Sequence, residues 1–265
     1  MNLLNSLWLR PALFLTLLTV LGACEVVWPR RTLTQIKRSR WGANLALTFF
    51  NGLILRFIIP LSLVSIASRA QELGIGLLNL FSLSPSLELI LSLFFLDFFI
   101  YLQHVATHKF SFLWKFHQVH HADLDLDVSS GTRFHTIEIV LSLCYKTLII
   151  LLIGPSALSV ILFEIILNSM AMFNHSNINL PVVVDKYLRL LVVTPDMHRV
   201  HHSSDHREHN RNFGFNLSVW DFLFQTYQDF PKLGQLKMEI GLTYFRDAKL
   251  ISPLSLVKMP FIKKN

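Results

Sequence analysis

Five long apolar segments limit what this chain can fold into. Each contains few charged side chains and is about 17 to 25 residues long, enough to cross a bilayer as a helix. The segments are Pro11–Trp28, Ala43–Ala67, Leu87–Gln103, Ile137–Ile153 and Ala157–Phe173. Hydrophobic residues form 52% of the 265-residue chain and charged residues only 15%, a composition typical of membrane proteins. We therefore predict an all-α, multi-pass transmembrane bundle of about five spans, organised as one domain over residues 1–265.

Basic residues between the first two segments predict the orientation of this bundle. Arg30, Arg31, Lys37, Arg38 and Arg40 lie within a dozen residues, and the positive-inside rule places such a patch in the cytoplasm. The same rule accounts for the net charge of +7, so we do not expect nucleic-acid binding. Counting spans from this patch brings the ends of the third and fifth segments to the cytoplasmic face. We expect a bacterial inner membrane, with the endoplasmic reticulum as the alternative.

Histidine clusters near these segment ends predict a metal site. The clusters are His104 and His108, then His117, His120 and His121, and later His198, His201 and His202. Residues three and four apart share a helix face, and neutral imidazole binds zinc, copper, iron and nickel well. A structural zinc takes four ligands and a catalytic zinc usually three. Eight histidines therefore indicate two metal ions rather than one.

Two further histidines are candidate ligands. His175 ends a polar stripe that also contains Glu164 and Asn168, so it is predicted to enter the site from the fifth segment; the alternative is an interfacial histidine. His135 is either a ligand or a hydrogen-bonding neighbour of the site. His206 and His209 lie among charged residues and are interpreted as solvated.

Three carboxylates are candidates for orienting the imidazoles by accepting hydrogen bonds from them. Asp97 shares a helical face with His104 and His108, although it could instead be hydrated near the interface. Asp196 directly precedes the last cluster, and Glu138 follows His135 by three residues. Asp123, Asp125 and Asp127 alternate along the chain and are interpreted as solvated or as further orienting groups. The segment Pro181–Val193 is predicted to form an amphipathic interfacial helix.

The ordered motifs HVATH, HQVHH and HRVHH, with TRFHTIE and FNHSN between them, resemble the membrane-bound fatty acid hydroxylase/sterol desaturase superfamily over about residues 20 to 228. The resemblance implies a non-haem di-iron oxygenase that uses two iron ions and O2 on a lipid, with zinc as a substitute ion in purified material. It implies a catalytic core at about residues 85–228 and places the stretch around His135 and Glu138 near the metals. Gln225 stands where the family usually has glycine.

The resemblance leaves the reaction and the electron donor open. Hydroxylation and desaturation share a hydrogen abstraction, and we favour hydroxylation. The chain contains no dinucleotide-binding glycine fingerprint and no haem or iron–sulfur cysteine pattern, so a separate donor is expected, cytochrome b5-like or a ferredoxin with its reductase. Two other functions are considered. One is a metal transporter or metal-binding protein without oxygenase activity, and the other is a zinc hydrolase, whose HExxH motif is absent from this sequence.

Overall fold

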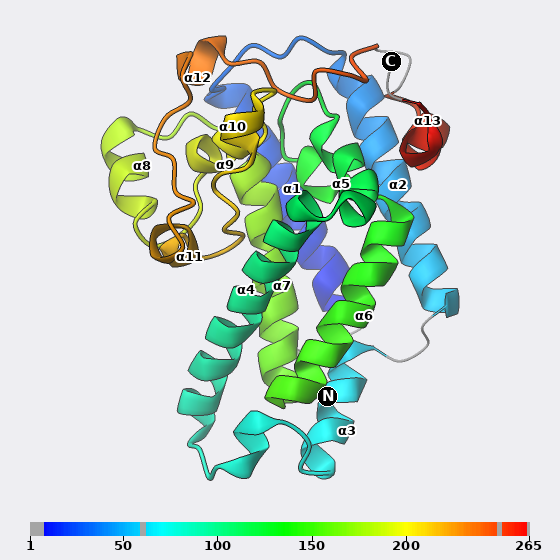
Figure 1. Ribbon diagram of the computed structural model, residues 1–265, viewed down its shortest axis with the longest axis vertical. Helices are drawn as coiled ribbons and strands as arrows, with labels where there is room; N and C mark the ends of the chain where they lie inside the picture. The colour runs from blue at the N-terminus through cyan, green and yellow to red at the C-terminus, as the bar shows by residue number, and fades with distance from the viewer. Residues whose placement is uncertain (1–7, 59–61, 248–250, 264–265) are drawn as a thin grey trace.

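Five long helices form the bundle in the computed structural model, which describes residues 8–58, 62–247 and 251–263 (Figure 1). They are α1 (Leu9–Val27), α2 (Lys37–Ile58), α4 (Pro85–Lys109), α6 (Thr136–Ile153) and α7 (Ala157–His175). Each of the five apolar segments is long and hydrophobic enough to cross a membrane. The described residues form helices joined by loops, with isolated β-bridges only. The prediction of an all-helical membrane protein with about five spans is confirmed.

The second apolar segment is not one helix, as the sequence predicted, but two. Ser62 has an extended backbone and caps α3 (Leu63–Glu72) by accepting a hydrogen bond from the Ser65 amide. Pro60 lies outside the described residues. Helix α3 packs against α6 and α7, and its Leu63 and Ala67 join the main apolar core. The stretch 68–85, between the second and third apolar segments, contains the end of α3 and the short helix η2 (Leu77–Leu80).

A tight turn between α6 and α7 folds the fourth and fifth apolar segments into a hairpin. Gly154 ends α6 in the left-handed conformation at φ 72°, and the Ser156 hydroxyl caps the start of α7. A side chain at Gly154 would also meet the backbone of Gly76 at 2.9 Å, so this corner of the bundle requires glycine. The hairpin returns the chain to the end of the bundle where α4 finishes (Figure 1).

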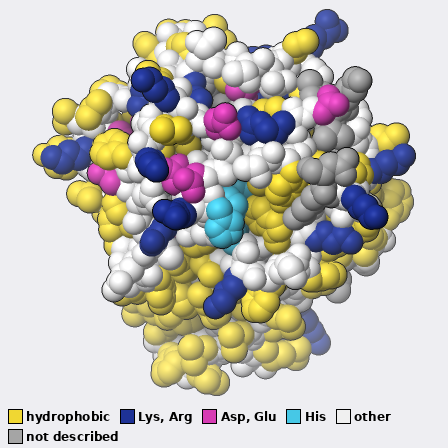
Figure 2. Space-filling model, turned by 45° about the horizontal axis from the view of Figure 1, so that its top comes forward, with side chains coloured by type: hydrophobic (Ala, Val, Ile, Leu, Met, Phe, Trp, Pro, Cys, Tyr) yellow, Lys and Arg dark blue, Asp and Glu magenta, His cyan; other side chains and the backbone are white. Residues whose placement is uncertain are grey.

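Short helices and loops cover that end of the bundle. They are α5 (Ser111–His121), η3 (Ser130–Thr132), α8 (Val182–Leu188), α9 (Pro195–His201), α10 (His206–His209), α11 (Val219–Leu223), α12 (Gly234–Lys237), α13 (Pro253–Lys258) and η5 (Met259–Phe261). Figure 2 shows charged side chains on this end of the visible face and mainly hydrophobic ones below them. Helix α8 is shorter than the predicted segment Pro181–Val193, and its Val182 and Val183 are exposed. That it lies on the membrane surface stays a prediction.

Candidate metal centre

Nine of the ten predicted metal-binding histidines come together at this end of the bundle. They form two groups, in each of which one ligand atom per residue lies within 4.8 Å of all the others. The first group is His104, His108, His117, His121 and His201, and the second is His120, His175, His198 and His202. Helices α4, α5, α7 and α9 supply these side chains, so the site depends on the packing of four separate elements.

The second group converges on one point. The Nε2 atom of His175 lies 3.0 Å from that of His120, 3.1 Å from that of His198 and 3.2 Å from that of His202. Nitrogen ligands about 2.0–2.1 Å from one tetrahedral ion are separated by about 3.3 Å. The three distances from His175 are close to the spacing that one ion with four imidazole ligands requires. His175, predicted from the polar stripe on its helix, is the central member of the group.

The two groups are in direct contact. In the first group the Nε2 atoms of His108 and His121 lie 3.1 Å apart, and the ring of His104 lies 4.5 Å from that of His201. The His121 ring stacks on His202 of the second group, with ring centroids 4.4 Å apart. Two ions held by these groups would therefore be neighbours, as a two-metal site requires.

Backbone carbonyls orient four of these nine rings. The Nδ1 atoms of His104 and His201 lie 2.8 Å from the carbonyls of Phe213 and Arg211, and that of His120 lies 3.2 Å from the carbonyl of Arg133. His175 Nδ1 lies 2.7 Å from the Ala171 carbonyl. A carbonyl only accepts, so each Nδ1 donates a proton and each Nε2 keeps its lone pair for a metal.

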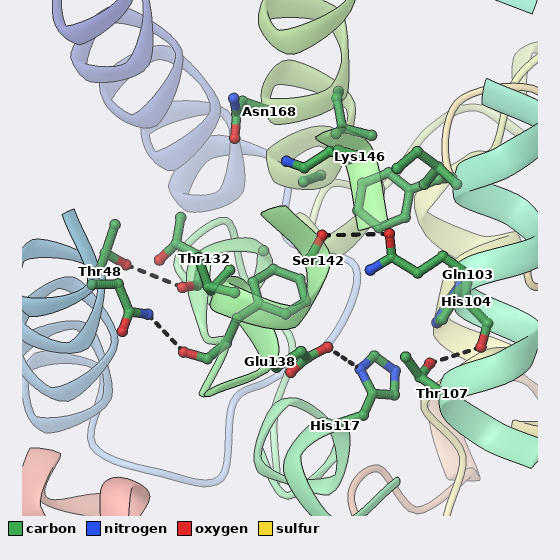
Figure 3. Close-up of a pocket in the computed structure, with 18 of the residues that line it drawn as sticks. Thr48, Gln103, His104, Thr107, His117, Thr132, Glu138, Ser142, Lys146 and Asn168 are labelled. Carbon is green, nitrogen blue, oxygen red and sulfur yellow. Dashed lines mark hydrogen bonds and ion pairs between the residues drawn. The ribbon is translucent and has the colours of Figure 1, made fainter. Parts of the chain in front are cut away.

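Glu138 is the one predicted carboxylate that contacts an imidazole. Its Oε1 atom lies 2.6 Å from Nδ1 of His117, and both side chains are buried (Figure 3). This contact fixes the ring and directs its Nε2 atom inward.

The buried nitrogens of the site fit a bound metal. Nε2 of His117 and Nε2 of His201 have no hydrogen-bond partner among the described residues. Burial, reinforced by neighbouring imidazoles, lowers the pKa of five histidines well below the usual value: His120, His121, His198, His201 and His202. These rings are therefore neutral near pH 7, which is the form that binds metal. An unpartnered buried nitrogen is unfavourable, and coordination would satisfy it.

The predicted contacts of Asp97 and Asp196 with imidazoles are not formed. Asp97 instead accepts hydrogen bonds from Trp220 Nε1 at 2.8 Å and from the Leu217 amide at 3.2 Å. It thereby ties α4 to the loop that carries the Phe213 carbonyl. Asp196 pairs with Arg30, at 2.9 Å, and with Arg199. Both carboxylates hold the segments around the site rather than the rings themselves.

Two other predictions about histidines need revision. His135 lies outside both groups: its Nδ1 atom accepts from the Ile137 amide at 3.1 Å, which caps α6, and its Nε2 donates to the Val257 carbonyl at 3.1 Å. Of its two predicted roles, the structure supports hydrogen bonding, directed to the backbone. His206 is exposed, as expected, but His209 is only 9% exposed and stacks on Trp114, with ring centroids 5.3 Å apart. Packing against that ring removes His209 from water.

A buried arginine that the sequence did not indicate organises the loop after α5. Arg40 is fully buried and pairs with Asp123 at 2.8 Å and Asp127 at 2.6 Å, while its Nη2 donates to the Asp125 carbonyl at 2.8 Å. The three aspartates therefore neither face water nor contact imidazoles. Their partner is 83 or more residues away along the chain, so no local sequence pattern predicts the pairing.

A cavity of about 320 Å³ lies beside the metal centre, with His104, His117 and Glu138 at one end. Its walls come from α1, α2, α4, α6 and α7 and are mostly apolar (Figure 3). This volume lies in the range of small-molecule sites, about 300–1,000 Å³. The cavity gives an apolar compound access to the histidine groups from within the bundle.

Together, the apolar helical bundle and the paired histidine groups define a membrane protein with a histidine-rich candidate metal centre. Comparison with known proteins agrees: the family model described as fatty acid hydroxylase matches residues 89–226, just over half of the chain. The chain belongs to the fatty acid hydroxylase family. This confirms the resemblance that the histidine motifs indicated.

Named relatives are lipid-modifying enzymes. The chain is 29% identical to an ornithine lipid hydroxylase, OlsE, of Rhizobium tropici over 59% of its own length and 46% of the relative's. It is 30% identical to the alkylglycerol monooxygenase of Homo sapiens, over 50% of the chain and 28% of the relative. The corresponding Caenorhabditis elegans protein is also 30% identical, over 52% and 26%. The chain thus aligns with less than half the length of these relatives. No solved structure matches it.

Proposed function

We propose that this protein is a di-iron oxygenase that uses O2 and external electrons to hydroxylate a C–H bond of a membrane lipid. The observation that carries the proposal is the position of nine histidines, eight of them buried, in two touching groups beside a largely apolar cavity. The names of the matched relatives, a lipid hydroxylase and monooxygenases, support the same reaction class. The catalytic core is proposed to be residues 85–228 within a single domain.

Each group of histidines would hold one iron ion, with zinc as a substitute ion in purified protein. Bound iron would supply the activation of oxygen and the hydrogen abstraction that no protein side chain can perform. The protein's own residues fix the ligands: the Phe213, Arg211 and Arg133 carbonyls and Glu138 hold the rings before any metal arrives. The apolar cavity walls exclude water from the reacting carbon.

The site is proposed to face the cytoplasm, because the Arg30–Arg40 patch lies at the same end of the bundle as the histidines. The proposed membrane is the bacterial inner membrane. Electrons would come from a separate donor, a cytochrome b5-like protein or a ferredoxin with its reductase. A metal transporter is not favoured, since transport sites line a path near the bilayer midplane and these histidines gather at one end.

Isotope labelling tests the proposal. The iron-loaded protein, reconstituted in lipid bilayers with a reductant and ¹⁸O2, is incubated with a lipid extract, and the products are analysed by mass spectrometry. Hydroxylation predicts lipids that contain one ¹⁸O atom, whereas desaturation predicts unlabelled products that have lost two hydrogens. A His198→Ala variant is the control. Unchanged lipids, or products that form equally with the variant, would refute the oxygenase function.

A further inference from the structure

The cavity beside the metal centre ends in a lysine. Glu138, Ser142 and Lys146 follow each other at intervals of four on α6, and all three line the cavity. Glu138 contacts the metal-binding His117, and Lys146 lies eight residues further along the helix, about 12 Å away at 1.5 Å per residue. Figure 3 shows Lys146 and Asn168 at the opposite end of the cavity from His117 and Glu138.

Lys146 has no counter-ion in contact with it. Within the described ranges of the chain it forms no ion pair or hydrogen bond, and the carboxylate that acts on it electrostatically is Glu164. Glu164 is already paired, because its Oε2 atom lies 2.7 Å from Arg10. Lys146 lies in the middle of a membrane-spanning helix, where ionisable side chains are rare and costly unless they serve a function.

Two other polar side chains, Asn168 and Gln103, line the same cavity as Lys146, and the Asn168 amide donates to the Glu164 carbonyl at 2.7 Å. Gln103 lines the same cavity, and its Oε1 atom accepts a hydrogen bond from Ser142 at 3.4 Å. Its amide nitrogen makes no hydrogen bond with the described residues and is free to donate. Much of the remaining wall is apolar, including Phe14, Leu55 and Leu167. Lys146 therefore brings a positive charge to the end of the cavity away from His117, the Gln103 amide is a further donor along its wall, and the apolar side chains suit hydrocarbon.

We propose that Lys146 binds an acidic oxygen group of the substrate, a carboxylate or a phosphoryl group. This inference rests on the proposed function, since it takes the cavity as the substrate site. The substrate's hydrocarbon chain extends from Lys146 towards His117, so the oxidised carbon lies about 12 Å from the acidic group, or roughly ten carbon–carbon bonds. Pairing compensates both charges inside the bundle, so a neutral lipid of the same length binds less tightly.

Binding measurements on the full-length, iron-free protein in lipid nanodiscs test this assignment. The probes are radiolabelled dodecanoate, dodecyl phosphate and dodecanol. The wild-type protein is expected to bind at least one of the acidic probes about tenfold or more tightly than dodecanol, and the better of the two identifies the acidic group. Equal affinity of the wild-type protein for all three probes would overturn the proposal.

Substitutions assign the preference to Lys146. Lys146→Met should remove the preference for acidic probes while dodecanol still binds, and Lys146→Arg should keep it. Lys237→Met, at an exposed lysine, serves as the matched control and should behave as the wild type. A preference that survives in Lys146→Met would overturn the proposal. If Lys146→Met fails to fold, Lys146→Gln replaces it and should also lose the preference for acidic probes. A preference that survives in Lys146→Gln, or is missing from the wild-type protein, would overturn the proposal.

The outcome is independent of the oxygenase assay, because binding is measured without iron. Selective binding of acidic probes together with unchanged lipids under ¹⁸O2 would retain the anion site and refute the oxygenase. Labelled products from a protein that does not prefer acidic probes would retain the oxygenase and refute the anion site.

Discussion

Replacing Arg40, a buried residue of α2, by methionine should strongly destabilise the protein. Arg40 is fully buried and makes five hydrogen bonds, to Asp123, Asp127, the Asp125 carbonyl and Ser130. Burial alone would raise the pKa of Asp123, but Arg40 and Arg133 together hold it well below its usual range. Without Arg40, two buried carboxylates share one remaining arginine.

Removing one partner of a buried ion pair costs about 3–5 kcal/mol. For a chain of this size each kcal/mol corresponds to about 2–4 °C, so Arg40→Met should lower the Tm by on the order of 10 °C. Thermal unfolding in detergent, followed by circular dichroism, measures the shift. Arg38→Met is the matched control, because Arg38 belongs to the same basic patch but is exposed.

A second variant tests the cause. Arg40→Met combined with Asp127→Asn leaves one arginine, Arg133, facing one aspartate, Asp123, at 3.6 Å. This double variant should recover part of the lost stability, because the unbalanced carboxylate is gone. The argument from buried charge would be refuted if Arg40→Met and Arg38→Met had the same Tm. It would also be refuted if the double variant had a lower Tm than Arg40→Met alone.

Three further substitutions separate side chains that hold the rings from those that hold the fold. Glu138→Ala should weaken metal binding by about 10–100-fold, measured by titration against a chelating dye, whereas Glu239→Ala, an exposed control, should not change it. His135→Ala should lower stability by about 1 kcal/mol through loss of the α6 cap and keep the full metal content; loss of a metal ion would contradict its placement. Asp97→Ala should cost about 1–3 kcal/mol, because Trp220 Nε1 loses its buried acceptor, and should leave the metal content of folded protein unchanged; metal loss from folded protein would contradict this.

Sequence periodicity predicted which histidines come together at the candidate metal centre. His104 and His108 share a face of α4, and His175 follows from the length of the α6–α7 hairpin, which returns the chain to the same end. Helical spacing and the length of a membrane span are local properties, so the pattern of hydrophobic residues predicts both. The nine histidines that the structure brings together were all among the predicted ligands.

The partners of these side chains were not predictable in the same way. Helical spacing put Asp97 on the histidine face of α4, but the ring of His104 is held by the Phe213 carbonyl, and a backbone carbonyl leaves no mark in the sequence. The partner of Asp123 lies 83 residues earlier, at Arg40. Alternating aspartates therefore gave the pattern of a solvated loop, because tertiary pairing that buries charge is invisible to local composition.

The metal content of the purified protein tests the central claim most directly. Protein expressed in iron-supplemented medium is analysed by elemental mass spectrometry, and its absorption spectrum is recorded after reduction and again after exposure to air. Two histidine groups predict two iron ions per chain and a spectrum that changes with oxygen. One tightly bound zinc ion per chain, with no response to oxygen, would contradict the two-metal oxygenase site.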